Sequence, residues 1–194
     1  MRGPAGKKFV SRAGEKLEAA LEAFGLDVGG ATCADFGCNV GGFTDCLLRR
    51  GAARVYAVDT GYGTLAWTLR RSDRVVAMER TNALRCPVPE PVDLVVIDVG
   101  WTPQERILPA AARWLKAGGQ AIALLKPHYE VAHRRGVRPH ARLADAEAER
   151  VCLDVCRHLD ASPCELCAAM RSPLRGKGGN LEFLLLARRR GSAV

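Results

Sequence analysis

The 194-residue chain contains no apolar run long enough to cross a membrane, since a spanning helix needs about 20 consecutive apolar residues. Its start, MRGPAGKK, is basic but lacks the apolar core of a secretory signal peptide. Internal repeats, low-complexity tracts and long linkers are also missing. We therefore expect a cytoplasmic protein without a membrane partner, folded as one domain over residues 1–194. Residues 1–10 would be a basic extension and 188–194 a basic tail.

Lysine is scarce, because only six of the 29 basic residues are lysines. Arginine supplies a permanent cation, whereas a lysine shielded from water can lose its proton and act as a base. A lysine within a motif is therefore of interest, although any single one could be an ordinary surface residue. The six are Lys7, Lys8, Lys16, Lys116, Lys126 and Lys177.

The sequence gives little support for disulfides or a metal site. Its eight cysteines are unevenly spaced, which favours reduced thiols. Cys164 and Cys167 form one C-x-x-C pair and could join Cys152 and Cys156 in a zinc site. On a strand, however, Cys164 and Cys167 would face opposite sides, so we expect buried thiols and no metal. The histidines show no ligand spacing and are His128, His133, His140 and His158.

Positive charge is in excess, with 29 basic against 21 acidic residues and a net charge of +8. The excess collects at the N-terminus, over 133–138 and over 188–190. A polyanionic partner such as nucleic acid would fit this pattern, and so would solubilising surface charge.

Helical and strand patterns alternate along the chain, which predicts a doubly wound, Rossmann-like α/β sheet. A basic, proline-containing loop is expected between Pro127 and the helix at 144–159. Asp35, Asp59, Asp98 and Lys126 would lie along the carboxyl edge, where such sheets bind ligands. Strands are expected at 31–36, 54–59, 75–78, 92–99, 120–127, 165–170 and 181–187, and helices at 11–24, 43–48, 64–70, 104–115 and 144–159.

The segment DFGCNVGGF at 35–43 follows a short apolar run and leads into a helix. This arrangement is typical of a glycine-rich loop that binds a nucleotide-type cofactor. Gly37, Asn39 and Gly42 fall at the spacing of the dinucleotide fingerprint, and Asp59 lies at the distance expected for a ribose contact. The middle glycine of that fingerprint lets backbone touch a pyrophosphate, but here Asn39 takes its place. S-adenosylmethionine has no phosphate and tolerates this side chain, so a methyltransferase is favoured over a nicotinamide enzyme.

Several ordered motifs together resemble the FtsJ-type RNA 2′-O-methyltransferases, and within them the catalytic domain of the TlyA group, often labelled hemolysin-like. The resemblance covers nearly the whole chain. The motifs are SRAGEKL at 11–17, DFGCNVGGF at 35–43, TDCLL at 44–48, AVDTGYG at 57–63, ERTN at 79–82, ID at 97–98, KP at 126–127 and GGNLEF at 178–183.

The resemblance implies a seven-stranded, mostly parallel methyltransferase sheet whose last strand is antiparallel, with S-adenosylmethionine as the donor. It also implies a reacting quartet of Lys16, Asp98, Lys126 and Glu182. Asn82, expected near the adenine, stands where many relatives carry an aspartate. The implied cofactor contacts are Asp35, Gly37, Asn39, Gly41, Gly42, Phe43, Asp59, Asn82 and Asp98.

A ribose 2′-hydroxyl is a poor nucleophile that must lose its proton as it attacks a sulfonium methyl in line. Lys126 is the candidate base, because burial, the positive sulfur and a neighbouring Lys16 would disfavour its charged form. Asp98 and Glu182 oppose that effect, so we expect them to orient the amines and the hydroxyl. Any one of the four residues alone could have a structural role. Because all four match the family motifs in order, we favour a reacting site.

Three functions stay open at this point. The favoured one is methylation of structured RNA, most simply ribosomal RNA, by a monomer. The others are an NAD(P)-dependent oxidoreductase and a non-catalytic RNA-binding or hemolysin-like protein. Relatives usually carry an S4-like RNA-binding module before the helix, whereas ten residues precede Ser11 here, so a partner could replace it. Cys38-Asn39 and Gly100-Trp101 also depart from the family pattern.

Overall fold

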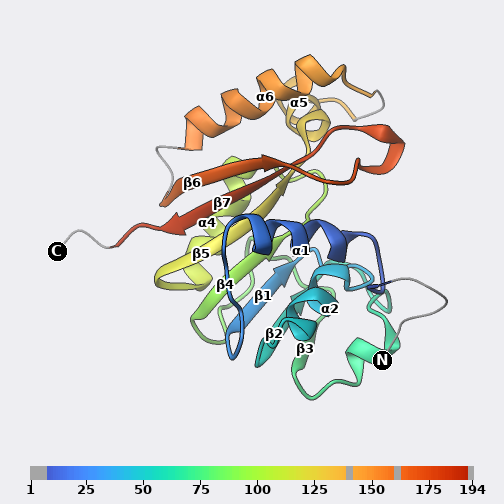
Figure 1. Cartoon of the computed structure of the whole chain (residues 1–194), viewed down its shortest axis with the longest axis vertical. Helices are drawn as coiled ribbons and strands as arrows, with labels where there is room; N and C mark the ends of the chain where they lie inside the picture. Colours follow the sequence, from blue (N-terminus) through green and yellow to red (C-terminus); the bar gives the residue numbers. More distant parts are fainter. Residues whose placement is uncertain (1–7, 139–141, 160–162, 192–194) are drawn as a thin grey trace.

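The computed structural model describes residues 8–138, 142–159 and 163–191. Most of the basic extension, His140 and the last residues of the basic tail therefore lie outside the described part. The described chain contains a seven-stranded sheet with helices on both faces (Figure 1). The mixed α/β architecture predicted from the alternating patterns is confirmed.

The strand order is β3-β2-β1-β4-β5-β7-β6, so the winding reverses between β1 and β4. The first five strands in sequence pair in parallel, and β7 runs antiparallel to both β5 and β6. The antiparallel last strand is thus confirmed. The strands are β1 (Thr32–Phe36), β2 (Arg54–Val58), β3 (Val75–Met78), β4 (Val92–Ile97), β5 (Leu115–Leu125), β6 (Cys164–Arg171) and β7 (Phe183–Arg189).

The helices bury their apolar stripes against the two faces of the sheet. α1 and α2 pack together on one face, while α4 and α6 cover the other (Figure 1). A 3-10 turn, η2 (Lys177–Gly179), precedes β7. The helices are α1 (Ala13–Ala23), α2 (Gly42–Arg49), α3 (Trp67–Arg70), α4 (Gln104–Trp114), α5 (Pro127–Arg135) and α6 (Asp145–His158).

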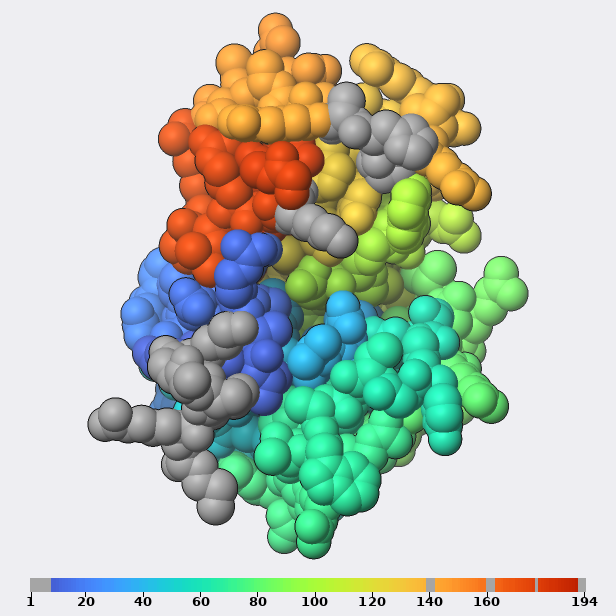
Figure 2. Space-filling model, turned by 90° about the vertical axis from the view of Figure 1, so that its right-hand side faces the viewer, coloured from blue at the N-terminus to red at the C-terminus, as the bar shows by residue number. Residues whose placement is uncertain are grey.

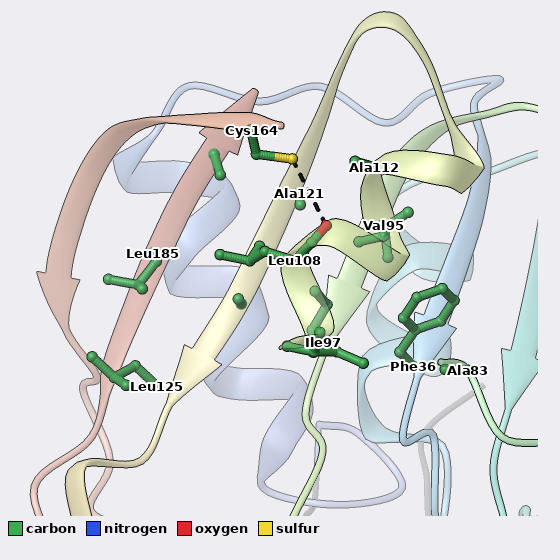
Figure 3. Close-up of a cluster of buried hydrophobic side chains, with 14 of the residues drawn as sticks. Phe36, Ala83, Val95, Ile97, Leu108, Ala112, Ala121, Leu125, Cys164 and Leu185 are labelled. Carbon is green, nitrogen blue, oxygen red and sulfur yellow. Dashed lines mark hydrogen bonds between the residues drawn. The ribbon is translucent and has the colours of Figure 1, made fainter. Parts of the chain in front are cut away.

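The core on the α4 side centres on Trp114, which is fully buried and meets Phe36 edge to face with ring centroids 5.3 Å apart. Figure 3 shows the aliphatic part of this core, where β1, β4, β5, β6 and β7 send side chains toward α4. The Cys164 thiol lies there, 3.9 Å from the Leu108 carbonyl oxygen. No disulfide joins any of the eight cysteines, all of which lie in the described part of the chain. Cys164 is buried but Cys167 is exposed, so the expectation of buried thiols is wrong for Cys167.

Two predictions about the segments around β5 were wrong. The expected loop after Lys126 is the helix α5, whose first residue is Pro127. Proline lacks a backbone N–H and is well suited to the first turn of a helix, so it starts α5 as well as ending β5. The strand β5 also begins earlier than expected, at Leu115, with a register shift against β4. As a result Lys126 lies at the junction of a strand and a helix.

Candidate active site

A cavity of about 460 Å³ opens at the carboxyl edge of the sheet, beside the point where the winding reverses. Figure 2 views the molecule from this side. Its volume falls in the range of sites that hold a small-molecule cofactor. The wall combines polar and apolar residues, namely Gly37, Asn39, Val58, Asp59, Thr60, Gly61, Thr81, Asn82, Ala83, Leu84, Asp98, Val99, Gly100, Trp101, Thr102 and Ile107.

Asp59 is held in a fixed orientation on this wall by two backbone amides. Asn39 N–H donates to its Oδ2 at 2.8 Å, and Gly61 N–H donates to its Oδ1 at 2.7 Å. A carboxylate oxygen can accept more than one hydrogen bond, so each oxygen keeps acceptor capacity. The Asp59 carboxylate is therefore prepared to accept two hydroxyl groups, such as those of a ribose.

The amides of the glycine loop are used within the protein. Gly37 and Cys38 both donate to the Val58 carbonyl oxygen, at 2.8 and 3.2 Å, and Asn39 donates to Asp59. At these three positions no backbone donor is left for a ligand. The helix α2, whose first amides are the usual anion-binding donors, begins later, at Gly42.

The glycines of the loop allow close packing. Gly37 has a φ of +82°, and a Cβ there would lie 2.6 Å from the Asp98 carbonyl oxygen. Gly42 lies under the start of α1, where a Cβ would come within 2.2 Å of the Ser11 hydroxyl. Asn39 has a φ of +47°, which asparagine tolerates better than most residues. The loop thereby brings β1, the end of β4 and α1 together.

Lys126 and Asp98 form an ion pair at the mouth of the cavity, with Nζ and Oδ1 2.5 Å apart. Lys126 also donates to the Val99 carbonyl oxygen at 3.2 Å and lies over the Tyr129 ring, 5.5 Å from its centroid. Both members of the pair are mostly buried. Parallel strands β4 and β5 end at the same edge, which is why these residues meet.

Lys16 and Glu182 form a second, more deeply buried ion pair, with Nζ and Oε2 2.5 Å apart. Lys16 lies on the buried face of α1, among residues that include Leu17 and Ala20. Gly176 leaves room for the partner, because a Cβ at that position would lie 2.0 Å from Glu182 Oε1. The structure therefore contains two lysine–carboxylate pairs, and Glu182 of this one lies beside the end of β5, where Lys126 follows.

Asp35 is fully buried below the loop, where its Oδ2 accepts hydrogen bonds from the Thr44 amide at 2.9 Å and hydroxyl at 2.7 Å. Its Oδ1 has no partner in the described part of the chain. Burial raises the pKa of the Asp35 carboxyl to about 7, and the Thr44 hydrogen bonds partly offset that effect. Asp35 thus anchors the start of α2 and does not line the cavity.

The residues suggested for cofactor binding divide into two groups. One group lines the cavity and comprises Gly37, Asn39, Asp59, Asn82 and Asp98. The other supports the loop from behind and comprises Asp35, Gly41, Gly42 and Phe43, which are absent from the lining. Asn82 Oδ1 accepts from the Leu84 amide at 2.9 Å, which leaves its amide nitrogen as the available donor.

An aromatic pair lies beside the Lys126–Asp98 ion pair, and the sequence singles out only one of its two members. Trp101 stacks on Tyr129, with ring centroids 5.4 Å apart and an interplanar angle of 17°. Trp101 belongs to the Gly100-Trp101 departure from the family pattern, whereas Tyr129 falls in a segment expected to be a loop. The position of Tyr129 three residues after Lys126, on the same helical face, is the signal that could have identified it.

Comparison with known proteins assigns almost the whole chain to the family that its sequence motifs resemble. A family model described as FtsJ-like methyltransferase matches residues 9–189. The 16S/23S rRNA (cytidine-2′-O)-methyltransferase TlyA of Mycobacterium tuberculosis is 41% identical over 187 residues, covering 94% of this chain and 69% of the relative.

Solved structures agree on the fold. One from Streptococcus thermophilus, described by the hemolysin name, has a TM-score of 0.85 at 36% identity and covers 97% of this chain and 70% of its own. The N-methyltransferase NodS of Bradyrhizobium japonicum WM9 in complex with S-adenosyl-L-homocysteine has a TM-score of 0.60 at 18% identity. It covers 94% of this chain and 86% of its own, and at this identity the likeness concerns the fold alone.

Proposed function

The chain belongs to the FtsJ-like methyltransferase family, and on that premise we propose that it methylates a ribose 2′-hydroxyl of ribosomal RNA with S-adenosylmethionine as donor. The observation that carries the proposal is the Lys126–Asp98 ion pair, whose carboxylate lines the cavity. Together with the Lys16–Glu182 pair it would supply two amines and two carboxylates to an acceptor hydroxyl that meets a bound methyl donor. Residues 9–189 would act as one catalytic domain.

The cavity fits S-adenosylmethionine by its chemistry. Asp59 would accept the ribose hydroxyls, and the Asn82 amide would face the adenine between the apolar side chains of Ala83 and Leu84. Asp98 would carry the negative charge near the methionine end. When bound, S-adenosylmethionine supplies a methyl group on a positively charged sulfur. The acidic groups Asp59 and Asp98 in the cavity wall suit such a cation.

Lys126 would accept the proton of the 2′-hydroxyl. Its Nζ is held by Asp98 and by the Val99 carbonyl oxygen, and it lies over the Tyr129 ring. A second positive charge in the cavity would compete with Lys126 for the Asp98 carboxylate. Lys126 could then take the proton while Val99 and Asp98 keep its Nζ in place.

Lys16 and Glu182 would position the acceptor. Their ion pair is well buried, so removing one partner would leave an uncompensated charge and disturb the site. Glu182 would accept a hydrogen bond from the ribose, and Lys16 would hold the Glu182 carboxylate in the orientation required. This role needs no change in the protonation of either residue.

The substrate class rests on the relatives and on charge. A curated relative acts on 16S and 23S rRNA by its name, and this chain carries a net charge of +8. The exposed Trp101, stacked on Tyr129 beside Lys126, would offer a surface to the base of the target nucleotide. Because ribosomes are cytoplasmic, we expect the protein to act there as an RNA-binding enzyme.

The other two functions are not favoured. A nicotinamide enzyme would need close approach of backbone to a pyrophosphate at the middle position of the loop, where this chain has Asn39. No helix in the described ranges is long and apolar enough to span a bilayer. The hemolysin name of one solved relative belongs to that protein, and the lysine–carboxylate pairs have no use in a membrane-damaging mechanism.

Mapping of 2′-O-methyl groups on ribosomal RNA from cells with and without the gene tests the proposal. We expect at least one 2′-O-methyl group to disappear in the deletion and to return with the wild-type gene. Complementation with a Lys126→Arg gene should leave it absent. An unchanged map would contradict the proposal.

A further inference from the structure

Three aromatic side chains are mostly exposed in the described part of the chain, and all three follow the carboxyl ends of parallel strands. Tyr62 and Trp67 are each 67% exposed and Trp101 is 61% exposed. Burial of a large aromatic side chain normally stabilises a protein. Three exposed aromatic side chains at one edge of the sheet therefore indicate a binding surface. Trp101 belongs to the cleft already described, whereas Tyr62 and Trp67 lie outside it.

Each of these two outer rings has an arginine over it. The Arg80 guanidinium lies 4.3 Å from the Tyr62 ring centroid, and the Arg71 guanidinium lies 5.8 Å from the Trp67 ring. We call Tyr62, Trp67, Arg71 and Arg80 the aromatic–arginine surface. No carboxylate in the described ranges pairs with Arg71 or Arg80, so their N–H groups remain available.

The neighbouring arginines of the same segment are used differently. Arg70 pairs with Glu79, and Arg74 donates to the carbonyl oxygens of Leu48 and Ala52 at 3.2 and 3.1 Å. These two hold the segment together. Arg71 and Arg80 make no comparable side-chain hydrogen bond or ion pair in the described ranges. Arg70 and Arg74 therefore stabilise the fold of this short segment, whereas Arg71 and Arg80 remain available to bind a ligand.

Internal hydrogen bonds hold the segments that carry this surface together. Arg80 has a φ of +51°, an uncommon conformation for this residue, and its N–H donates to the Gly61 carbonyl oxygen at 3.0 Å. The Gly63 amide donates to Glu79 Oε1 at 2.8 Å, and the same oxygen pairs with Arg70. Glu79 thereby ties the loop that carries Tyr62 to the helix that carries Trp67.

The surface borders the cofactor cavity. Gly61 and Thr81, the sequence neighbours of Tyr62 and Arg80, belong to the cavity wall. In Figure 2 the teal and green segment 60–80 forms the lower part of the side that carries the cavity, and α6 lies at the top. An extended polymer seated in the cleft could therefore reach the surface.

We propose that the aromatic–arginine surface binds unpaired nucleotides of the RNA substrate, outside the catalytic cleft. Bases would stack on Tyr62 and Trp67, and phosphates would accept hydrogen bonds from Arg71 and Arg80. Unpaired RNA fits better than duplex, because rings exposed on a surface can stack only on bases that are not already paired. This inference rests on the proposed function and adds a second RNA contact to it.

Fluorescence anisotropy with a labelled RNA hairpin that has an unpaired loop, and with the matching duplex, tests the surface. Tyr62→Ala and Trp67→Ala should each weaken hairpin binding about tenfold or more, the range expected for one stacked base, and change duplex binding less. Arg71→Gln with Arg80→Asn should lower the salt dependence of hairpin binding by roughly 0.7 in log–log slope for each phosphate that is no longer neutralised. Asparagine suits the positive φ of Arg80.

Leu153→Ala and Arg157→Ala on α6 are the matched controls, because both residues are exposed and lie at the other end of the molecule (Figure 1). Equal hairpin affinities for the wild type, the surface variants and these controls would overturn the proposal. So would a wild-type protein that does not bind the hairpin at all.

A direct reading comes from Trp67 itself. The difference in tryptophan emission between the wild type and Trp67→Phe isolates the signal of Trp67, because both proteins share Trp101 and Trp114. Stacking on a base should quench this Trp67 emission when hairpin RNA is added, and equal quenching in the two proteins under saturating RNA would contradict stacking. Hairpin affinity is measured without methyl transfer, so an error in the catalytic assignment is distinguishable from an error here.

Discussion

Lys16 and Glu182 are separated by 166 positions in the chain, and the lysine Nζ lies 2.5 Å from a Glu182 carboxylate oxygen. The sheet topology brings them together. Leu125 and Phe183 pair across β5 and β7, so Glu182 stands beside the end of β5, where Lys126 follows. The antiparallel last strand thus returns a carboxylate to the edge at which the parallel strands present Asp98 and Lys126.

Lys126→Arg should abolish methyl transfer and leave S-adenosylmethionine affinity within about twofold of wild type. Arginine keeps the positive charge beside Asp98 but cannot give up its proton. Transfer of labelled methyl groups to ribosomal RNA and calorimetric titration of the cofactor measure the two effects. The control is Lys116→Arg, since Lys116 forms a similar pair with Asp93 on the protein surface, 2.6 Å apart. Retained transfer in Lys126→Arg would refute the assignment of the base.

Asp59→Asn should weaken S-adenosylmethionine binding by about 10- to 100-fold. The backbone N–H groups of Asn39 and Gly61 each donate to one Asp59 oxygen, so the asparagine NH₂ would face one of these two donors. The substitution also removes a charged acceptor, whose hydrogen bonds are worth about 1.5–3 kcal/mol. Asp27→Asn is the matched control, because Asp27 accepts from the Gly29 amide in a similar turn. Unaltered cofactor affinity in Asp59→Asn would remove Asp59 from the binding site.

Gly176→Ala should reduce kcat for methyl transfer about 10- to 100-fold with little effect on cofactor affinity. A methyl group there would displace the Glu182 carboxylate by its overlap with Oε1, and small misplacements of reacting groups have effects of this size. Gly191→Ala is the control, since a Cβ at Gly191 meets nothing within 4 Å. Wild-type kcat in Gly176→Ala would show that the Glu182 position is unimportant.

Asp35 should make folding stability depend on pH. Burial raises the pKa of the Asp35 carboxyl from 3.8 to about 7. The contribution of this group to the free energy of unfolding is therefore fully present below about pH 4 and is lost as the pH rises through about 7. The loss is on the order of 4 kcal/mol at most, because one pKa unit corresponds to about 1.4 kcal/mol. Asp35→Asn, which keeps an acceptor for Thr44, should gain stability relative to wild type between pH 5 and pH 8.

Denaturant unfolding of both proteins across that pH range measures the effect. A stability difference between wild type and Asp35→Asn that stays constant with pH would show that Asp35 is ionised in the folded protein at all these values.

Most of the sheet was predictable because its strands are short apolar runs closed by glycine, proline or an acidic residue. α5 was not, because only three of its nine residues are buried, namely Pro127, Glu130 and Ala132. A helix with so small a buried face has little hydrophobic periodicity. Its basic end at Arg134 and Arg135 is equally typical of a solvated loop.

The residues of the candidate site could be predicted from the sequence, but the contacts between them could not. Motif order named Lys16 and Glu182, yet no local pattern could show that they form one ion pair across most of the chain. The use of the Gly37 and Cys38 amides by Val58 was equally hidden, because it depends on the pairing of β1 with β2. Long-range contacts of this kind are set by the complete fold.

Reconstitution with purified components tests the central claim most directly. The protein would be incubated with S-adenosylmethionine and ribosomal RNA from cells that lack the gene, and the RNA would be digested to nucleosides for mass spectrometry. The account predicts a 2′-O-methylated nucleoside with wild-type protein and none with Lys126→Arg. A methyl group on a base, or no methylated product with the wild-type protein, would contradict it.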